Sequence, residues 1–442
     1  MCLTRRELLL RSTLLVFVVL FWSCSLLAKA KVRVPYPFAV VLTGSVSLMG
    51  QPIDSLAAYA FDGSRWRRVA CQVDERNRRG DYVLSEGLPY TSRSDDRLFD
   101  RNDEVALWGT DFGAPFTSKQ IDKKLREGWK DFWHISLNSD LGYHGDLLIV
   151  RERSNNVQNS IKNMVYFDPL KKEITSSEYY YRFKDAKAAL LGDLSVNVGG
   201  KRLPVIKRSQ FTMNFELPWY LPDFSLNDDN FSSEIESWQV GPVRAIVAVG
   251  VKFRNFLKMF NFHMFSELVF YQNSFRIPTI VEFPIDPSRH FQLGTGIAYT
   301  IDFSDEQHMS FNSNLKYLPA NGPKAYIEGG GELADTSPYY YIDGRFGEKL
   351  LLMKVEVDPK AAKTSMPPFL IRQQSFVDKN LIKQWPWLDG MSGEVGAFID
   401  ISRVHKGSYD FSLDIFLSPE ANEKVMSSVD SLRTNWLSTS SQ

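Results

Sequence analysis

The sequence predicts a mainly β protein, with a small N-terminal β-sandwich followed by a larger antiparallel β domain and a short C-terminal helix. Phe, Tyr and Trp make up 13% of its 442 residues, a share typical of strand-rich chains. Short runs of β-branched and aromatic residues alternate with Gly, Pro, Asn and Asp. A sustained apolar pattern at helical spacing occurs near the C-terminus, so helix is expected there.

Residues 1–30 have the three parts of a signal peptide. Arg5, Arg6 and Arg11 form a positively charged N-terminal region, and an apolar segment runs from Ser12 to Leu27. The sequence AKA at 28–30 places small residues at the two cleavage positions. The sequence TRRELL at 4–9 also resembles a twin-arginine export signal, although two arginines fit an ordinary secretory signal equally well. Lipidation at Cys24 is a further alternative. We therefore expect a protein that is exported to the periplasm and loses this leader.

The chain that remains is long enough for two domains. The whole sequence carries 52 Lys and Arg and 52 Asp and Glu, and the leader holds more basic than acidic residues. The mature chain is therefore slightly acidic, and nucleic acid is not an expected partner. Cys71 is the one cysteine outside the leader, which excludes an internal disulfide and indicates a buried thiol. No later stretch reaches the ~18 apolar residues of a transmembrane helix.

A polar run, RERSNNVQNSIKN at 151–163, separates the two predicted domains. It follows the apolar segment Gly145 to Val150, which has the composition of a strand. We assign residues 31–160 to the N-terminal sandwich and residues 161–442 to the larger domain.

The larger domain contains several segments that alternate apolar with polar or small residues, as a sheet with one solvated face requires. The expected strands are Arg244 to Phe253, Met264 to Phe275, Ile277 to Ile285, Thr295 to Phe303 and Lys349 to Pro359. The C-terminal helix is expected over Ser418 to Leu437. Ser418 suits its N-cap and Pro419 its first helical position.

An acidic turn, FDRNDEVALWGTDFG at 99–113, is the first candidate site. Calcium is bound by oxygen ligands, often at alternate positions of a loop, and Asp100, Asn102 and Glu104 alternate in this way. Asp74 could approach from a neighbouring strand. These four residues are the expected metal ligands, with Ca²⁺ as the ion. The alternative is that Asp100 and Asn102 shape a turn through their own backbone, while Asp103 and Glu104 face solvent.

Two segments resemble a family of secreted bacterial β-sandwich proteins of unknown function. QVDE at 72–75, followed by DRNDEVALWGTDFG, is similar to the Gln-x-Asp stretch and acidic turn of that family, and VGPVRAIVAVGVKF at 240–253 resembles its Gly-Pro-x-Arg-Ala strand. The family's Asp-Gly-Asp-Gly is replaced here by Asp-Arg-Asn-Asp. The resemblance implies that the larger domain is similar to the galactose-mutarotase-like super-sandwich, a fold shared by sugar-binding and polysaccharide-degrading enzymes. One fold hosts many functions, so no chemistry follows from it.

Three aromatic clusters, at 216–224, 337–346 and 383–390, place bulky rings beside Pro, Asp or Gly, and hence on loops. Such rings can stack on sugars while nearby carboxylates bond the hydroxyl groups; alternatively, they fill the ends of a sandwich. Arg244 could clamp an anionic sugar or pair with a carboxylate of the protein. The candidate ligand-binding residues are Trp219, Tyr220, Arg244, His290, Tyr340, Trp385 and Trp387. The scattered histidines do not predict a zinc or haem site, no nucleotide site is expected, and no catalytic set can be assigned.

The leading hypothesis is therefore an exported protein that binds a glycan or another polar polymer, with catalysis left undecided. One alternative is a carbohydrate-active enzyme of mutarotase-like fold, such as a lyase, hydrolase or epimerase. Another is a structural or assembly protein whose partner is a component of the cell envelope.

Overall fold

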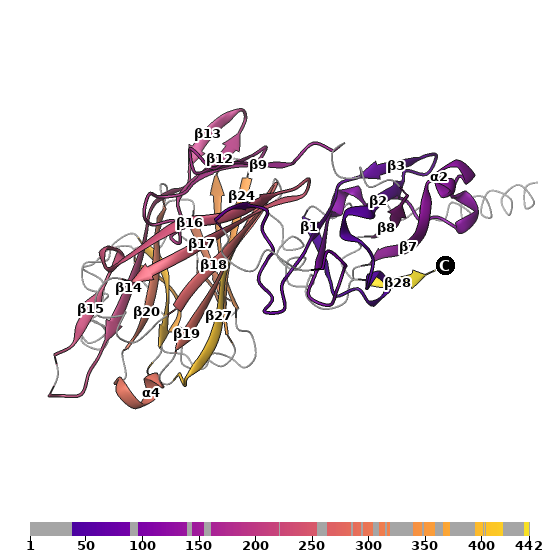
Figure 1. The fold of residues 1–442 in the computed structure, drawn as a ribbon. Helices are drawn as coiled ribbons and strands as arrows, with labels where there is room; N and C mark the ends of the chain where they lie inside the picture. Colours follow the sequence, from indigo (N-terminus) through magenta and orange to yellow (C-terminus); the bar gives the residue numbers. More distant parts are fainter. Residues whose placement is uncertain are drawn as a thin grey trace, which may run out of the picture.

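The computed structural model of this chain is mainly β, as the sequence predicts, and its paired strands are antiparallel. It describes residues 38–88, 96–138, 144–153, 161–220, 222–253, 263–283, 286–292, 295–303, 309–313, 316–318, 339–346, 349–358, 366–371, 394–400, 402, 404–418 and 437–441. Figure 1 shows an N-terminal part in indigo and purple beside a larger part in magenta to yellow. Within the described residues, α-helix is limited to α2 (Lys123–Glu127) and α4 (Pro287–His290).

The N-terminal part contains two sheets that enclose an apolar core. A three-stranded sheet has the order β1-β6-β4, and a five-stranded sheet has the order β28-β7-β8-β2-β3. Their bounds are β1 Ala39–Thr43, β2 Leu56–Phe61, β3 Trp66–Val69, β4 Cys71–Asp74, β6 Glu104–Trp108, β7 Trp129–Asn138, β8 His144–Glu152 and β28 Leu437–Ser441. Because β28 pairs with β7, the C-terminal strand completes a sheet of the N-terminal part (Figure 1).

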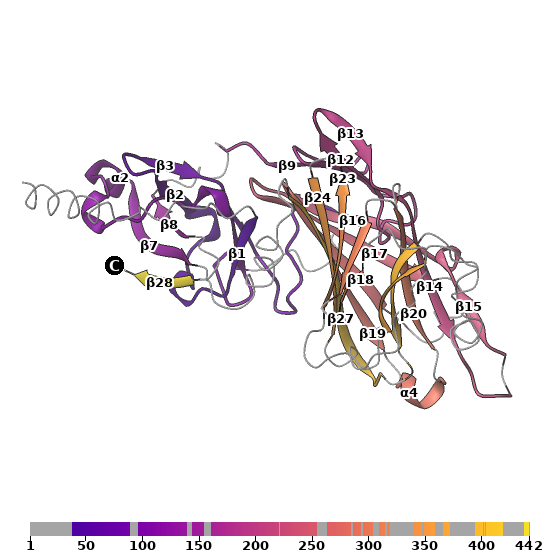
Figure 2. The same ribbon diagram turned by 180° about the vertical axis from the view of Figure 1, so that it is seen from behind.

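The larger part is built on a ten-stranded sheet with two five-stranded sheets packed against it. The ten-stranded order is β22-β21-β23-β24-β27-β19-β18-β17-β16-β5, and the smaller sheets are β13-β12-β11-β10-β9 and β15-β14-β20-β26-β25. One apolar core joins β9–β13 to β17, β18, β24 and β27, and another joins β14 and β20 to β19 and β27. The view from behind in Figure 2 shows these layers.

The strands of the larger part have the following bounds: β5 Glu86–Gly87, β9 Val165–Asp168, β10 Glu173–Ser176, β11 Tyr179–Arg182, β12 Asp193–Val198, β13 Lys201–Pro204, β14 Ile206–Phe215, β15 Phe224–Leu226, β16 Phe231–Val240, β17 Arg244–Phe253, β18 His263–Tyr271, β19 Ser274–Phe283, β20 Gly296–Phe303, β21 Met309–Ser313, β22 Lys316–Leu318, β23 Tyr339–Phe346, β24 Lys349–Val357, β25 Met366–Ile371, β26 Glu394–Asp400 and β27 Gly407–Ser418. The predicted strand over Arg244 to Phe253 coincides with β17. The prediction placed the break between β18 and β19 at Arg276, but the turn falls at Gln272 and Asn273. Polar residues at that turn mark it better than the alternation does.

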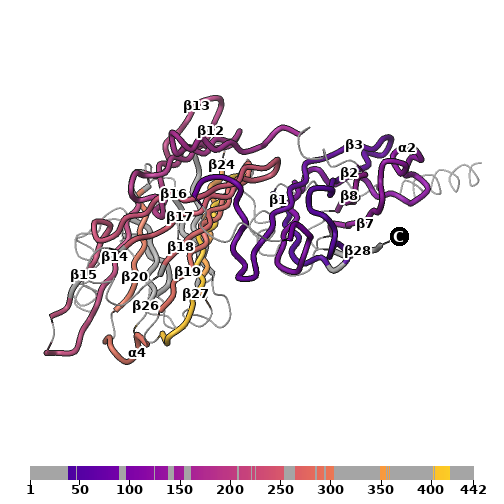
Figure 3. The backbone as a smooth tube through the Cα atoms, in the orientation of Figure 1, coloured from indigo at the N-terminus to yellow at the C-terminus, as the bar shows by residue number. Residues whose placement is uncertain are grey.

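A short segment of the N-terminal part crosses to the larger part and joins its sheet. Strand β5 pairs with the outer strand β16, and the dark tube of this segment can be followed in Figure 3. Gly87 has φ 84°, and a Cβ there would lie 2.5 Å from the carbonyl oxygen of Glu236. Glycine is therefore required where the two backbones meet. Tyr82 and Leu84 of the same segment pack on Ile246 of β17.

Several predictions fall on residues that the structure does not describe. These are the signal peptide at 1–30, the boundary near residue 160, Trp385 and Trp387. Of the predicted C-terminal helix, Ser418 ends β27 and Leu437 begins β28, while residues 419–436 lie outside the described set. The domain limits and the export signal stay predictions. In the part of the chain that is described, no helix is long and apolar enough to cross a membrane.

Candidate functional site

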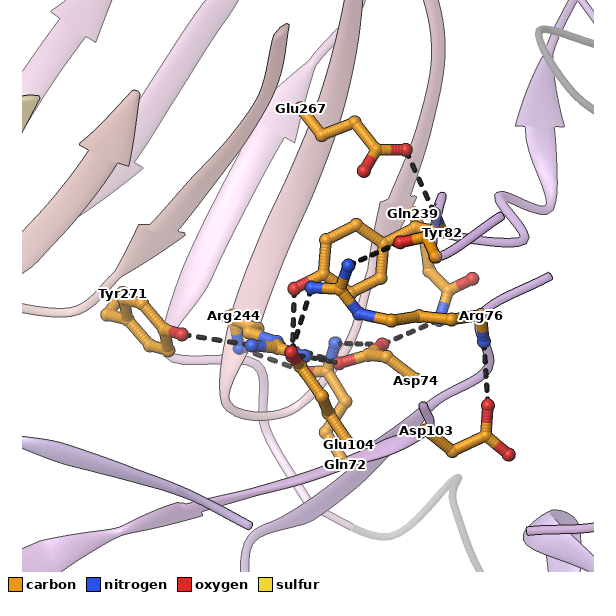
Figure 4. A network of polar contacts seen from close by, with 11 residues as sticks. Gln72, Asp74, Arg76, Tyr82, Asp103, Glu104, Gln239, Arg244, Glu267 and Tyr271 are labelled. Atoms are coloured by element: carbon orange, nitrogen blue, oxygen red, sulfur yellow. Dashed lines mark hydrogen bonds and ion pairs between the residues drawn. The ribbon is translucent and has the colours of Figure 1, made fainter. Parts of the chain in front are cut away.

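A buried polar network joins the N-terminal part to the ten-stranded sheet (Figure 4). Asp74 on β4 and Glu104 on β6 are direct partners in the strand register, so two carboxylates lie next to each other. Like charges in that position repel, and a cation must lie between them. Arg244, the first residue of β17, supplies it: its Nε donates to Asp74 Oδ2 at 2.7 Å and its Nη2 to Glu104 Oε2 at 2.6 Å.

The other polar groups around Arg244 also form hydrogen bonds within the protein. Its Nη1 donates to the Tyr271 hydroxyl at 2.9 Å, and its backbone N–H donates to Gln72 Oε1 at 2.9 Å. Gln72 and Gln239 each donate to Asp74 Oδ1, at 2.8 and 2.9 Å. Arg244 is only 1% exposed, so the guanidinium has exchanged water for protein partners on every side.

The segment that crosses between the two parts adds a second layer to this network. Arg76 Nη2 donates to Glu104 Oε1 at 2.8 Å, and the Arg76 guanidinium lies 3.8 Å from the centre of the Tyr82 ring. The Tyr82 hydroxyl donates to Glu104 Oε2 at 2.8 Å, and the Tyr82 backbone N–H donates to Glu267 Oε1 at 2.9 Å. Glu104 is thus held by three donors and Glu267 by one backbone donor.

These two glutamates have pKa values displaced in opposite directions. Burial acts to raise the pKa of Glu104, but Arg244, Arg76 and their hydrogen bonds outweigh it and lower that pKa to about 2. Burial raises the pKa of Glu267 to about 7, because the Tyr82 N–H and the more distant Arg76 compensate only part of the desolvation. A pair displaced in this way can serve acid and base catalysis where substrate reaches it. Here both carboxyl groups are buried and engaged with the protein, and the network ties the two parts of the molecule together.

Two of the predicted cation ligands, Asp74 and Glu104, meet on neighbouring strands as expected. Asp74 and Glu104 face Arg244. Asn102 donates its backbone N–H to Asp100 Oδ1 at 3.0 Å, which is the turn that the alternative interpretation describes. The other half of that alternative is wrong, since Asp103 is buried and accepts the Arg76 N–H at 2.7 Å. Among the described residues, no three His, Cys, Asp or Glu side chains form a metal-binding group. Calcium at this turn stays a prediction.

An exposed site lies at the other end of the larger part, on the loop from 216 to 223 between β14 and β15. Trp219 is 92% exposed and Tyr220 is 65% exposed, and their ring centres are 5.8 Å apart at an interplanar angle of 89°. The carboxyl groups at the base of the loop are close enough to interact: burial raises the pKa of Glu216, and the neighbouring Asp223 carboxylate raises it further. The Leu217 N–H fixes Asp223 by donating to its Oδ1 at 2.7 Å.

A second loop, which contains α4, is bonded to the first. The Gln292 N–H donates to the Glu216 carbonyl at 2.8 Å, and the Glu216 N–H donates to Thr295 Oγ1 at 2.8 Å. His290, at the end of α4, is exposed. We call residues 216–220, 222, 223, 286–292 and His405 the rim. In Figures 1 and 2, α4 marks its place at the bottom of the molecule.

His405 and Asp286 form an ordered pair on this rim. His405 Nδ1 lies 3.3 Å from Asp286 Oδ1 and 3.4 Å from Ser288 Oγ, and Ser288 donates to the same Asp286 oxygen at 2.6 Å. The hydrogen bond from Ser288, followed by the hydrogen bond from His405 and the charges of His405 and Arg289, lowers the pKa of Asp286. Ser288 and Asp286 face the same ring nitrogen, so this is not the arrangement of a Ser-His-Asp triad. It orients an imidazole that is 76% exposed.

The structure brings three of the predicted ligand-binding residues, Trp219, Tyr220 and His290, to one end of the molecule. Arg244 is not among them, since it pairs with Asp74 and Glu104 inside the network. Tyr340 lies in β23, and its side chain is outside the described set, as are Trp385 and Trp387.

Sequence reasoning missed most of the network, namely Gln72, Arg76, Tyr82, Gln239, Glu267 and Tyr271. One signal was present. Gln72 and Asp74 alternate with the apolar Cys71 and Val73 along β4, and polar side chains at every second position of a buried strand need partners. Only the structure explains Gly241, because a Cβ there would lie 2.3 Å from the Gln72 side chain.

No protein-family profile and no curated protein matches this chain. Among solved structures, it is similar to an α-mannosidase from Enterococcus faecalis V583, with 8% identity and a TM-score of 0.45 over 93% of this chain and 44% of that one. A heparan sulfate lyase HepC mutant from Pedobacter heparinus shares 6% identity, with a TM-score of 0.29 over 62% of this chain and 38% of that one. A candidate aldose 1-epimerase from Escherichia coli K12 shares 10% identity, with a TM-score of 0.22 over 54% of this chain and 98% of that one. The chain spans less than half the length of the mannosidase and the lyase. These likenesses concern the arrangement of strands and not the chemistry of a site.

Proposed function

We propose that this protein binds a glycan at the rim. The observation that carries the proposal is the exposure of Trp219, an indole ring left almost wholly in water beside a second exposed ring. Aromatic rings exposed together on a loop mark interaction sites more often than isolated apolar residues do. For this cluster, the alternative that the rings fill the end of the sandwich does not apply.

The chemistry of the rim suits a pyranose ring. An aromatic face stacks on the apolar face of a sugar, and polar groups around it bond the hydroxyl groups. Glu216 and Asp223, whose proximity together with burial raises the pKa of Glu216, provide carboxyl oxygens that can accept hydrogen bonds from sugar hydroxyl groups. The oriented imidazole of His405 and the exposed His290 provide further hydrogen-bonding groups on the neighbouring loop.

Affinity gel electrophoresis tests this proposal with two soluble polysaccharides, neutral hydroxyethylcellulose and anionic polygalacturonate. The double variant Trp219→Ala/Tyr220→Ala should bind the polysaccharide that retards the wild type at least about tenfold more weakly, as expected when two stacking contacts are lost. Leu88→Ala, which removes an exposed apolar side chain away from the rim, is the matched control and should migrate as the wild type does.

Unchanged retardation of the double variant would overturn the proposal, as would a wild type that neither polysaccharide retards. Both rings are exposed and support no core, so the double variant should have the melting temperature of the wild type. A thermal melt of each variant checks that the fold is intact.

A further inference from the structure

The sheet β13-β12-β11-β10-β9 has one face in the core and one face in solvent. Phe167, Ile174, Tyr181 and Leu194 are buried in the core that this sheet shares with the ten-stranded sheet. Since side chains alternate along a strand, the residues between them carry the outer face. None of these residues belongs to the rim, and Figures 1 and 2 place β12 and β13 at the end of the larger part opposite α4.

The strand register sorts this outer face into rows of distinct chemistry. One cross-strand row bears two tyrosine rings and two aliphatic hydroxyl groups and has no charge: Tyr166, Thr175, Tyr180, Ser195 and Pro204. The row on one side of it is entirely charged: Asp168, Glu173, Arg182 and Asp193. On its other side lies the pair Asn197 and Arg202. An uncharged aromatic row is thus bordered by donors and acceptors along its length.

The two rings of the central row are displayed differently. Tyr166 is 61% exposed on the outer strand β9. Tyr180 lies two strands away, at about 10 Å by the usual spacing of strands. The Arg202 guanidinium lies 4.4 Å from the centre of the Tyr180 ring, and the Tyr180 hydroxyl bonds to Glu173. The Tyr166 ring is therefore exposed to solvent, whereas the Tyr180 ring is stacked against the Arg202 guanidinium.

We propose that this outer face, which we call the tyrosine face, is a second glycan-binding surface, with an extended glycan chain lying across the strands along the Tyr166 row. A pyranose ring would stack on Tyr166. Successive hydroxyl groups would meet Thr175 and Ser195 within the row and the carboxylates and guanidiniums on either side.

Other classes of ligand fit the tyrosine face less well. Nucleic acid requires a predominantly basic surface, whereas the charged row holds three carboxylates and one guanidinium. A stable protein interface is expected to have an apolar centre, and here the central row alternates rings with hydroxyl groups. Rings spaced along a flat sheet and bordered by paired donors and acceptors match a neutral or mixed polysaccharide.

The inference has the same ligand class as the proposed function but rests on none of its residues. Two sites at opposite ends of one molecule would bind a long polysaccharide more tightly than a short oligosaccharide, because the second contact becomes intramolecular.

The test uses the full chain and the same two polysaccharides, hydroxyethylcellulose and polygalacturonate. Tyr166→Ala should weaken retardation by about tenfold, while Tyr166→Phe, which keeps the ring, should behave as the wild type does. Leu170→Ala is the matched control, since it removes an exposed apolar side chain from the adjacent β9–β10 turn without touching the row.

The rim variant Trp219→Ala/Tyr220→Ala is run in parallel so that the two proposals can fail separately. Weaker retardation of Tyr166→Ala alone supports the tyrosine face and overturns the rim. Weaker retardation of the rim variant alone overturns the tyrosine face. If Tyr166→Ala lowers the melting temperature and leaves retardation unchanged, the row only stabilises its sheet and the inference is wrong. A wild type that neither polysaccharide retards overturns both.

Discussion

The buried network and the rim use similar side chains in opposite surroundings. In the network, Asp74, Glu104 and Arg244 are shielded from water and satisfy one another. At the rim, Trp219 and His405 stand in solvent and leave most of their surface for another molecule. Residue type alone therefore does not identify a binding site in this protein. What matters is whether the fold has already supplied each polar or aromatic group with a partner.

Burial of the network has a consequence for stability that the rim does not share. Charges taken out of water recover the cost of desolvation only through good geometry and full hydrogen bonding, so the intact network contributes little net stability, while loss of one member is costly. It makes the attachment of the N-terminal part specific, because only one docking position pairs all of these groups.

Removal of the central cation should have the largest effect. Arg244→Met should lower the free energy of unfolding by about 3–5 kcal/mol, because Asp74 then remains buried beside Glu104 without a cation of its own, while Arg76 still pairs with Glu104. Urea unfolding at pH 7 measures this change in the free energy of unfolding. Arg289→Met, which removes an exposed arginine paired with Asp286, is the matched control and should change stability by no more than about 0.5 kcal/mol. If Arg244→Met and Arg289→Met lower the free energy of unfolding equally, the buried and the exposed arginine contribute equally to stability and this expectation is wrong.

Glu104→Gln should have the next largest effect, with a defined dependence on pH. The pKa of Glu104 in the folded protein, about 2, lies below the ordinary value of 4.5. Its charge therefore contributes stability that is present above about pH 4.5 and lost as the pH falls toward 2, about 3 kcal/mol in all. The wild type should exceed the variant by about that amount at pH 7, and the gap should close in acid. A gap that does not vary with pH would contradict this assignment.

Glu267→Gln should act in the opposite direction by about 2–3 kcal/mol. The pKa of Glu267 in the folded protein, about 7, lies above the ordinary 4.5, so its contribution is fully present below about pH 4.5 and is lost as the pH rises through 7. The variant should match the wild type at pH 4 and be the more stable of the two at pH 8, as measured by urea unfolding at both values. Glu234→Gln, on the exposed side of β16, controls for the removal of a charge. A variant less stable than the wild type at pH 8 would show that the Tyr82 N–H needs a charged acceptor.

The smallest effect on stability is expected at the rim. Trp219→Ala should change the free energy of unfolding by less than about 0.5 kcal/mol, because its ring contacts solvent on most sides. The same change should weaken retardation by the polysaccharide that binds the wild type. Chemical unfolding and affinity electrophoresis on one preparation give both numbers. A large loss of stability would mean that the ring supports the β14–β15 loop and is not held open for a ligand.

Local patterns in the sequence were sufficient for much of the fold. Alternation along 244–253 predicted β17 over its full length, and the apolar run from Lys349 predicted β24, which ends at Val357. The aromatic loop at 216–224 was also identified as a candidate binding loop, because Pro and Asp beside Trp219 and Tyr220 favour an exposed turn. These features depend on residues that are neighbours in the chain.

Pairing of Arg244 with a carboxylate was one of the two roles that the sequence suggested, but the partners themselves could not be predicted from neighbouring residues. Arg244 lies 170 residues from Asp74 and 140 from Glu104, and the resemblance in sequence marked both segments without showing that they meet. The acidic turn similarly fitted a cation and an arginine equally well, since either can neutralise adjacent carboxylates.

Local sequence patterns were enough to predict the strand content, the strands β17 to β20 and β24, and the loop that carries the exposed rings. Periodicity and turn chemistry act over a few residues, so they can be read along the chain. The packing of the sheets determines which buried carboxylates pair with an arginine and which buried carboxyl has a pKa raised to about 7. It also determines which aromatic rings stay exposed to solvent. Those outcomes depend on burial and on partners brought together from distant segments, and both arise only when the sheets pack.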